Sequence, residues 1–150
     1  MAITFKVQLV GITKPPVWRR FAIANNSTFY DLHRAIQMAF GWEDCHLWCF
    51  HGAKRMRNGW RVVSDTWDVE EGPSVDTKLC HCGLPSRFYY TYDFGDSWLH
   101  SIKIEQVDDE EVDGWHFIDS KGEDPQEDMG GVWGYLAYRA GEHPWNESED

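Results

Sequence analysis

Several features that mark other classes of protein are scarce or missing in this sequence. Only four of its 150 residues are cysteine, too few for the dense disulfide framework of a small secreted domain. No apolar run approaches the ~20 residues of a membrane span, and basic residues interrupt the first apolar stretches well before they could form a signal peptide. A cytoplasmic protein with reduced thiols, folded as one domain over residues 1–150, is therefore expected.

Positive charge is also in short supply, and it is unevenly distributed. The formal net charge is −11, which disfavours general attraction to nucleic acid or to an anionic membrane. Residues 1–63 nevertheless carry nine Lys and Arg against three Asp and Glu, whereas residues 64–150 carry five against 22. In a compact domain we expect the basic and acidic parts to pair; the alternative is a basic face left free for a polyanion.

Aromatic residues, in contrast, are abundant, since they make up 15% of the chain and nine of them are tryptophan. Tryptophan is rarely buried completely, so some of these rings are expected to line a groove for a protein partner, a peptide or a small ligand. The candidates for this binding groove, with polar residues beside them, are Trp18, Arg19, Trp42, His46, Tyr92, Trp98, Glu127 and Trp133.

The first half of the chain predicts two strands, a helix and a third strand. Apolar and polar residues alternate over 3–12 and 17–23, which is typical of neighbouring antiparallel strands. A threonine cap, an apolar stripe at helical spacing and a closing glycine predict a helix over about 28–40. A short aromatic strand over 45–51 would return against the first two strands. This β-β-α-β opening suggests a ubiquitin-like half sheet.

The second half predicts a hairpin, a further strand and a short helix. Aromatic and apolar residues alternate over 88–105 on both sides of a Gly-Asp turn, as expected of two hairpin strands. The remaining predictions are a basic loop over 52–61, a loop over 64–78 with a short strand at 66–69, a strand at 115–118, a loop at 121–131, a helix over about 132–139 and a frayed tail at 143–150. The predicted fold is a single α+β domain with a mixed, mostly antiparallel sheet.

Four stretches of the chain together resemble one family. They are Pro15-Pro16-Val17-Trp18-Arg19-Arg20; Leu32-His33 with Gly41-Trp42 and His46-Leu47; Tyr92-Asp93-Phe94-Gly95-Asp96-Ser97-Trp98-Leu99-His100; and Glu127-Asp128-Met129-Gly130-Gly131-Val132-Trp133-Gly134-Tyr135. On these motifs the chain is similar, from about residue 3 to residue 138, to the plasmid pRiA4b ORF-3-like family, which includes insertion-sequence passengers labelled resolvase-like. The resemblance implies a single α+β domain from plasmids or other mobile elements, and it implies no established biochemical activity.

The chain departs from the family's pattern near its end. Ser120 stands where many relatives have a cysteine, and Pro125-Gln126-Glu127-Asp128 replaces a run with two adjacent prolines. A role that requires a thiolate at position 120 is therefore not expected in this chain.

Acidic residues gather at the predicted hairpin turn. Asp93 and Asp96 flank the turn, His100 follows on the next strand, and Glu127 and Asp128 lie in the later loop. Carboxylates with an imidazole can ligate a divalent cation or act as general acid and base, so this set supports a metal-dependent enzyme, for example a hydrolase. The structural alternative is that Asp96 bonds its own turn, Asp128 caps the following helix and His100 lies in the core.

Cysteine and histidine residues are the candidates for a zinc site. Cys45 and Cys49 would lie on one face of a strand about 13 Å apart, too far to share an ion. A zinc site would therefore use Cys80, His81 and Cys82 with one distant partner. The alternative is that these thiols are free, whether buried or exposed.

The basic loop is the candidate for contact with nucleic acid. Lys54, Arg55, Arg57 and Arg61 surround Trp60 in this loop. Cations with an aromatic ring between them can follow a phosphate backbone and stack on a base. A solvated loop is the structural alternative.

Three functions are thus open on the sequence alone. The preferred one is a non-enzymatic binding module that uses the aromatic groove beside the acidic corner and takes an unidentified protein or small ligand. The alternatives are a metal-dependent enzyme using Asp93, Asp96, His100 and Asp128, and a mobile-element accessory protein that contacts DNA. A divalent metal is the cofactor that these hypotheses invoke.

Overall fold

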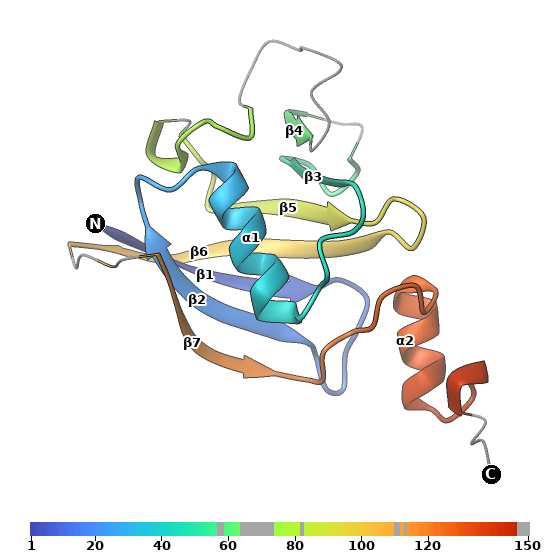
Figure 1. The fold of residues 1–150 in the computed structure, drawn as a ribbon. Coiled ribbons are helices and arrows are strands. Elements are labelled where there is room, and N and C mark those ends of the chain that lie inside the picture. The colour runs from blue at the N-terminus through green and yellow to red at the C-terminus, as the bar shows by residue number, and fades with distance from the viewer. Residues whose placement is uncertain (57–58, 64–73, 82, 110–111, 113, 147–150) are drawn as a thin grey trace.

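The computed structural model describes residues 1–56, 59–63, 74–81, 83–109, 112 and 114–146, which contain seven strands and two α-helices (Figure 1). The strands are β1 (Ala2–Leu9), β2 (Trp18–Ala24), β3 (Trp48–His51), β4 (Arg61–Val63), β5 (Arg87–Tyr92), β6 (Trp98–Asp108) and β7 (Trp115–Lys121). The helices are α1 (Phe29–Phe40) and α2 (Gly131–Arg139), and two short 3-10 helices, η1 and η2, cover Leu79–His81 and Pro144–Asn146. The strand predicted at 66–69 lies outside the described residues.

The strands form one sheet in the order β4-β3-β5-β6-β1-β2-β7. Each pairing among the described strands is antiparallel, so the prediction of a mostly antiparallel α+β domain is confirmed and no mixed character is found in this part of the chain. The ubiquitin-like opening is wrong, because β3 pairs with β4 and β5 rather than with β1 or β2. The long strand β6 lies beside β1 instead and joins the two halves of the sheet.

Helix α1 packs across one face of the sheet (Figure 1). It begins where the Asp31 amide donates to the Thr28 hydroxyl at 3.1 Å and the Thr28 amide donates to the Asp31 carboxylate at 2.9 Å. It ends at Gly41, whose φ of 72° is the left-handed conformation that glycine adopts most easily. The predicted boundaries are confirmed to within one residue, and the apolar stripe is buried at Phe29, Leu32, Ile36 and Phe40.

The cap of α1 makes a testable contribution to stability. Thr28→Ala is expected to lower the free energy of unfolding by about 1 kcal/mol, because the Asp31 amide loses its acceptor. Urea denaturation measures this change, and Thr28→Ser, which keeps the hydroxyl, serves as the control. An unchanged midpoint for Thr28→Ala would show that this cap does not hold the first turn.

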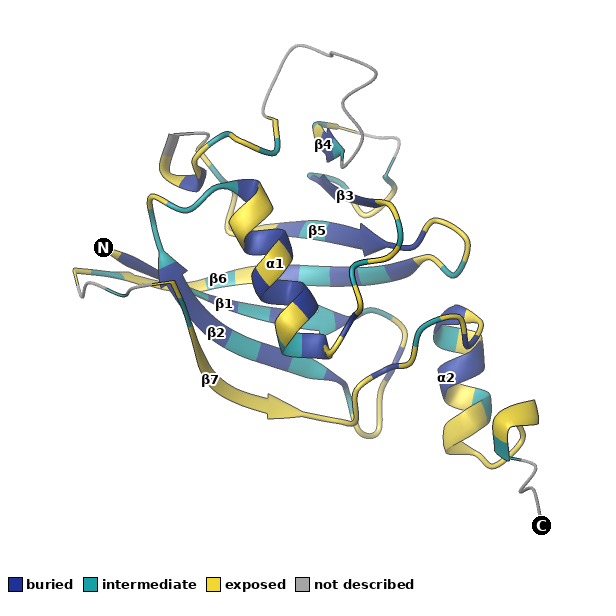
Figure 2. Cartoon of the chain, viewed as in Figure 1, coloured by how far each residue is buried: buried dark blue, intermediate teal, exposed yellow. Residues whose placement is uncertain are grey.

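The core lies between α1 and the sheet, and the opposite face of the sheet is polar. Along β1, Phe5 and Val7 are completely buried, whereas Lys6 and Gln8 are partly exposed. Figure 2 shows the same alternation along the neighbouring strands, while the edge strand β7 is exposed over most of its length. The sheet therefore presents two chemically different faces.

Cations of β2 pair with carboxylates from the C-terminal half, as the charge asymmetry predicted. Arg19 is buried on the α1 face, and its guanidinium lies 2.5 Å from an Asp124 oxygen and donates to backbone carbonyls. Arg20 points to the opposite face and pairs with Glu105 and Asp119 at 2.5 and 2.7 Å. These contacts hold the segment before α2 and strand β7 against β2.

The C-terminal segment is more ordered than predicted up to residue 146. His143 is buried, and its Nε2 lies 2.8 Å from the carbonyl oxygen of Met129. The η2 turn follows directly, and residues 147–150 of the predicted tail lie outside the described residues. Among the helices described, none combines the length and apolar character needed to cross a bilayer.

Candidate metal centre

Four side chains from three separate segments converge where β5 ends. His46 precedes β3, Asp93 directly follows β5, and Glu127 and Asp128 precede α2. Nε2 of His46 lies 3.5 Å from an Asp93 oxygen, 3.4 Å from a Glu127 oxygen and 3.1 Å from an Asp128 oxygen. We call these four residues the carboxylate–histidine cluster.

The Asp93 carboxylate is held in place through only one of its two oxygens. Oδ1 accepts hydrogen bonds from the backbone amides of Gly95 and Asp96, at 3.0 and 3.3 Å, and Oδ2 is the atom that faces His46. Asp93 and Asp128 both have left-handed backbones, with φ of 62° and 57°. Aspartate tolerates this conformation better than most residues, and such backbones are frequent at functional sites.

The Glu127 carboxylate is fixed in the same manner. Its Oε1 accepts from the Tyr92 hydroxyl and from the Glu43 amide, both at 2.9 Å, and its Oε2 faces His46. Burial raises the pKa of Tyr92, and the hydrogen bond to Glu127 raises it further, so the hydroxyl keeps its proton and remains a donor. In metal sites, hydrogen bonds of this kind, made to a ligand side chain by residues that do not themselves bind the metal, fix the orientation of the ligand.

Two atoms at the centre of the cluster make no hydrogen bond within the described part of the chain. They are Nε2 of His46 and Oε2 of Glu127, and both are buried. A buried polar atom without a partner costs about 1–3 kcal/mol and calls for a physical explanation. A proton on Nε2 could be donated to only one of the three nearby carboxylates. A divalent cation, in contrast, could bond Nε2 together with oxygens of Asp93 and Asp128, since these ligand atoms lie within 4.8 Å of one another.

The distances around His46 fit a cation shared with Asp93 and Asp128, because one ligand atom of each of these three residues lies within 4.8 Å of the other two. For metal–ligand distances of about 2.1 Å, neighbouring ligand atoms lie about 3.0 Å apart in octahedral and about 3.4 Å apart in tetrahedral geometry. His46 Nε2 lies 3.5 and 3.1 Å from the oxygens of Asp93 and Asp128. An imidazole nitrogen with carboxylate oxygens suits Mn²⁺, Fe²⁺ or Zn²⁺. Glu127 belongs to a second group within 4.8 Å, formed with His46 and Cys45.

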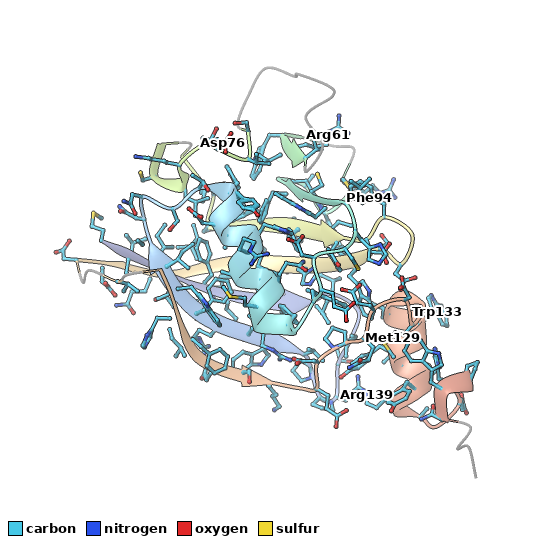
Figure 3. All side chains as sticks on the ribbon, in the orientation of Figure 1. Arg61, Asp76, Phe94, Met129, Trp133 and Arg139 are labelled. Carbon is cyan, nitrogen blue, oxygen red and sulfur yellow. The ribbon has the colours of Figure 1, made fainter. Side chains whose placement is uncertain are left out.

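One side of the cluster is open to solvent. The Asp128 side chain is 71% exposed, whereas the side chains of Asp93 and Glu127 are only 10% and 13% exposed. A cation held here would keep coordination positions for water or for a ligand on the Asp128 side. Exposed apolar side chains lie close to the ligands in sequence: Phe94 follows Asp93, and Trp133 is on the first turn of α2 (Figure 3).

The structure does not bring the other two predicted acid–base residues into the cluster. Oδ2 of Asp96 accepts from the Gly130 amide at 3.1 Å, so Asp96 ties the hairpin turn to the start of α2. His100 is completely buried. Its Nδ1 lies 3.0 Å from the Tyr90 carbonyl oxygen, and its Nε2 accepts from the Trp42 indole at 3.4 Å. These contacts give both residues structural roles.

The buried histidines predict sensitivity to acid. Burial lowers the pKa of His100 and of His33 from 6.5 to about 4. Between pH 6.5 and about pH 4, the two histidines take up protons in the unfolded chain but not in the folded chain. Their contribution to the free energy of unfolding is therefore fully present above pH 6.5 and is lost as the pH falls toward 4. The expected loss is about 3 kcal/mol for each histidine.

Urea unfolding at pH 7 and at pH 4.5 measures this loss. His100→Gln is expected to lower stability at pH 7 and to flatten the dependence on pH. A free energy of unfolding that is constant between these pH values in the unchanged protein would contradict the prediction.

The rings predicted to line a groove are mostly part of the core. Trp42 packs against Tyr92 and Trp98 with ring centroids 5.0 and 5.1 Å apart, and all three residues are buried. Trp18 lies on the opposite face of the sheet, while Trp133 is 87% exposed. Of the predicted binding residues, His46 and Glu127 therefore belong to the cluster, and only Trp133 is a freely exposed ring.

The remaining candidates lie away from the cluster or outside the described residues. Cys49 is buried in β3, and burial raises its pKa to about 11, while Cys80 is exposed in η1. The side chain of His81 and the whole of Cys82 fall outside the described part. In the basic loop, Lys54, Arg55 and Arg61 are exposed, and Arg57 is not among the described residues.

The comparisons with known proteins agree with the motifs quoted above. A family model described as plasmid pRiA4b ORF-3-like protein matches residues 1–147. The chain belongs to the plasmid pRiA4b ORF-3-like family. It is 36% identical over 144 residues to the uncharacterized protein y4hQ of Sinorhizobium fredii, in a match that covers 91% of this chain and 70% of that protein. The predicted family membership is thus confirmed.

A solved structure of this fold is also similar. The protein of unknown function MM3350 from Methanosarcina mazei Go1 superposes with a TM-score of 0.77 at 33% sequence identity, covering 93% of this chain and 80% of that one. The descriptions of both relatives state no activity, so a functional proposal for this pRiA4b ORF-3-like protein depends on its own residues.

Proposed function

We propose that this protein is a divalent-cation-binding domain. His46, Asp93 and Asp128 hold one cation, with Glu127 as a further donor beside His46, and the open side of that cation takes up an oxygen-bearing ligand. The observation that carries the proposal is the position of His46 Nε2, which is buried, makes no hydrogen bond in the described chain and lies 3.1 to 3.5 Å from three carboxylates.

The charge of the cluster supports the same conclusion. The ionised cluster carries three negative charges in a protein whose net charge is −11. Carboxylates gathered around one imidazole repel one another. A divalent cation would reduce the local charge to −1 and would bond His46 Nε2, one of the two central atoms that lack partners.

Ligand binding is better supported than catalysis. The enzyme hypothesis used Asp93, Asp96, His100 and Asp128, and the side chains of Asp96 and His100 are engaged elsewhere. Phe94, the residue after Asp93, and Trp133, on the first turn of α2, are exposed apolar side chains close to the ligands in sequence. A partner with a carboxylate or phosphate oxygen for the cation and an apolar group beside it fits this arrangement.

Thermal unfolding in the presence of Mn²⁺ and of Zn²⁺ tests the proposal. At a cation concentration of about 100 times Kd, the folded protein should gain about 2.7 kcal/mol of stability, and a chelator should remove this gain. Calorimetric titration should give one strong site per chain. The absence of stabilisation by either ion would contradict the proposal.

Hydrolysis is the second candidate, and the open side of the cluster favours it because a cation with free positions can activate bound water. Turnover of bis(p-nitrophenyl) phosphate by the Mn²⁺-loaded protein, lost in a folded Asp93→Asn variant, would support this candidate. Cation binding without turnover would support a binding module.

A further inference from the structure

A row of positive charge crosses four adjacent strands on the sheet face opposite α1. Arg87 of β5 lies beside Lys103 of β6 in the strand register. Lys103 in turn lies beside Lys6 of β1, and Lys6 lies beside Arg20 of β2. Like charges in directly opposite positions destabilise a sheet. Stability therefore does not explain this row, which stands out in a protein of net charge −11.

Only one end of the row forms short ion pairs with carboxylates that the structure describes, while Glu105 attracts Lys6 and Lys103 over a longer distance. Arg20 pairs with Glu105 and Asp119 at 2.5 and 2.7 Å. The hydrogen bond from Arg20 lowers the pKa of Glu105, so this carboxylate stays ionised at neutral pH. Among the described residues, no carboxylate lies within 4.0 Å of the charged groups of the other three cations.

These three cations line a cavity of about 400 Å³, which a fourth cation, Lys54, and the carboxylate of Glu105 also line. The turn after β1, residues 9–13, forms part of the wall. Gln8, Ser101 and Tyr89 add polar and aromatic groups to the lining. The volume lies within the range of small-molecule sites in proteins. We call this site the basic cavity.

We propose that the basic cavity binds a small phosphorylated molecule of nucleotide size that carries two or more negative charges. Ammonium groups bind phosphate oxygens as point charges, and a guanidinium can bind them with two parallel hydrogen bonds. Ser101 and Gln8 supply further hydrogen-bond donors. Tyr89 provides an aromatic side chain on which a planar base can stack.

The charge distribution favours a small ligand over a nucleic-acid strand. Residues 64–150 carry 22 acidic residues against five basic ones, and a long strand that extends beyond the cavity would meet their repulsion. A ligand that fits inside the cavity is exposed mainly to four cations and to Glu105, whose charge is partly offset by its ion pair with Arg20, because solvent screens charges beyond about 8–10 Å.

Calorimetric titration with ADP tests the proposal, in a buffer with EDTA so that cation binding does not contribute. The unchanged protein should bind ADP, and Lys103→Glu should weaken binding by about tenfold or more. This variant places a carboxylate between Arg87 and Lys6, so its melting temperature should stay the same or rise. Lys121→Glu makes the same charge change on β7, outside the cavity lining, and should leave the affinity for ADP within about twofold.

Three results would overturn the proposal. The first is no binding of ADP at millimolar concentration, and the second is equal affinity in the unchanged protein and in Lys103→Glu. The third is binding of a single-stranded oligonucleotide without binding of ADP, which would assign the basic cavity to nucleic acid.

Discussion

The Asp93→Asn variant is expected to bind Mn²⁺ about 100-fold more weakly than the unchanged protein, or not at all. Asparagine keeps an oxygen that can accept from the Gly95 and Asp96 amides, so the hairpin turn should remain folded. The variant loses the charged Oδ2 that faces His46 Nε2 at 3.5 Å. Calorimetric titration gives the affinity, and circular dichroism of the cation-free variant checks the fold.

Asp96→Asn is the matched control for this variant. It makes the same charge change three residues further along the same turn, but Asp96 bonds the Gly130 amide and does not face the cluster. Its affinity for Mn²⁺ should stay within about threefold of that of the unchanged protein, because the charge of Asp96 acts on the cation only at a distance and is screened by solvent. Equal losses in the two variants would indicate a general effect of charge and would contradict direct ligation by Asp93.

A second large effect is expected from Gly134→Ala in α2. A Cβ at this position would lie 2.6 Å from the carbonyl carbon of Met129 and closer still to the carbonyl oxygen. The variant can fold only if the backbone at Met129 or at residue 134 moves. Asp128, a ligand of the proposed cation, is the residue before Met129. We expect the variant to lose about 3 kcal/mol of stability and to bind Mn²⁺ more weakly. Urea denaturation and calorimetric titration measure the two effects.

Gly141→Ala separates the close contact from the general cost of replacing a glycine. Gly141 has a φ of 79°, and no atom lies within 4 Å of the Cβ that alanine would add. It should lose only about 1–2 kcal/mol, through backbone strain, and should bind Mn²⁺ normally. Without a clash, replacing a helical glycine by alanine stabilises the helix by about 1 kcal/mol. A Gly134→Ala variant more stable than the unchanged protein would therefore contradict the close contact with Met129.

Features set by neighbouring residues were predicted well from the sequence. The threonine cap and closing glycine of α1 depend on residues within one turn of the helix, and both are found in the structure. The alternation over residues 88–105 correctly separated β5 from β6, because the period of two is a local property. Local patterns do not state which strands pair, so the partners of β3 were predicted wrongly.

The four side chains of the cluster were all singled out in the sequence, and three of them, Asp93, Glu127 and Asp128, were grouped as possible cation ligands. His46 was assigned only to the aromatic groove. The decisive contact is long-range: the Asp93 amide donates to the carbonyl oxygen of Leu47 at 2.9 Å, which brings His46 beside the end of β5. No pattern within a single segment reveals such a contact.

The basic row was hidden in the sequence for the same reason. Each of its cations is an ordinary exposed position of an alternating strand, and they come from four strands spread between residues 6 and 103. Only the register of β5, β6, β1 and β2 aligns them. The negative net charge of the whole chain argued against general attraction to nucleic acid, and the excess of cations in residues 1–63 left a free basic face open only as an alternative, because sums over many residues do not locate a charge.

Anomalous diffraction from crystals grown with Mn²⁺ tests the central claim most directly. The account predicts one strong peak at about 2.0–2.3 Å from His46 Nε2 and from oxygens of Asp93 and Asp128. A map without a peak at this position, with His46 Nε2 donating to a single carboxylate instead, would contradict the account.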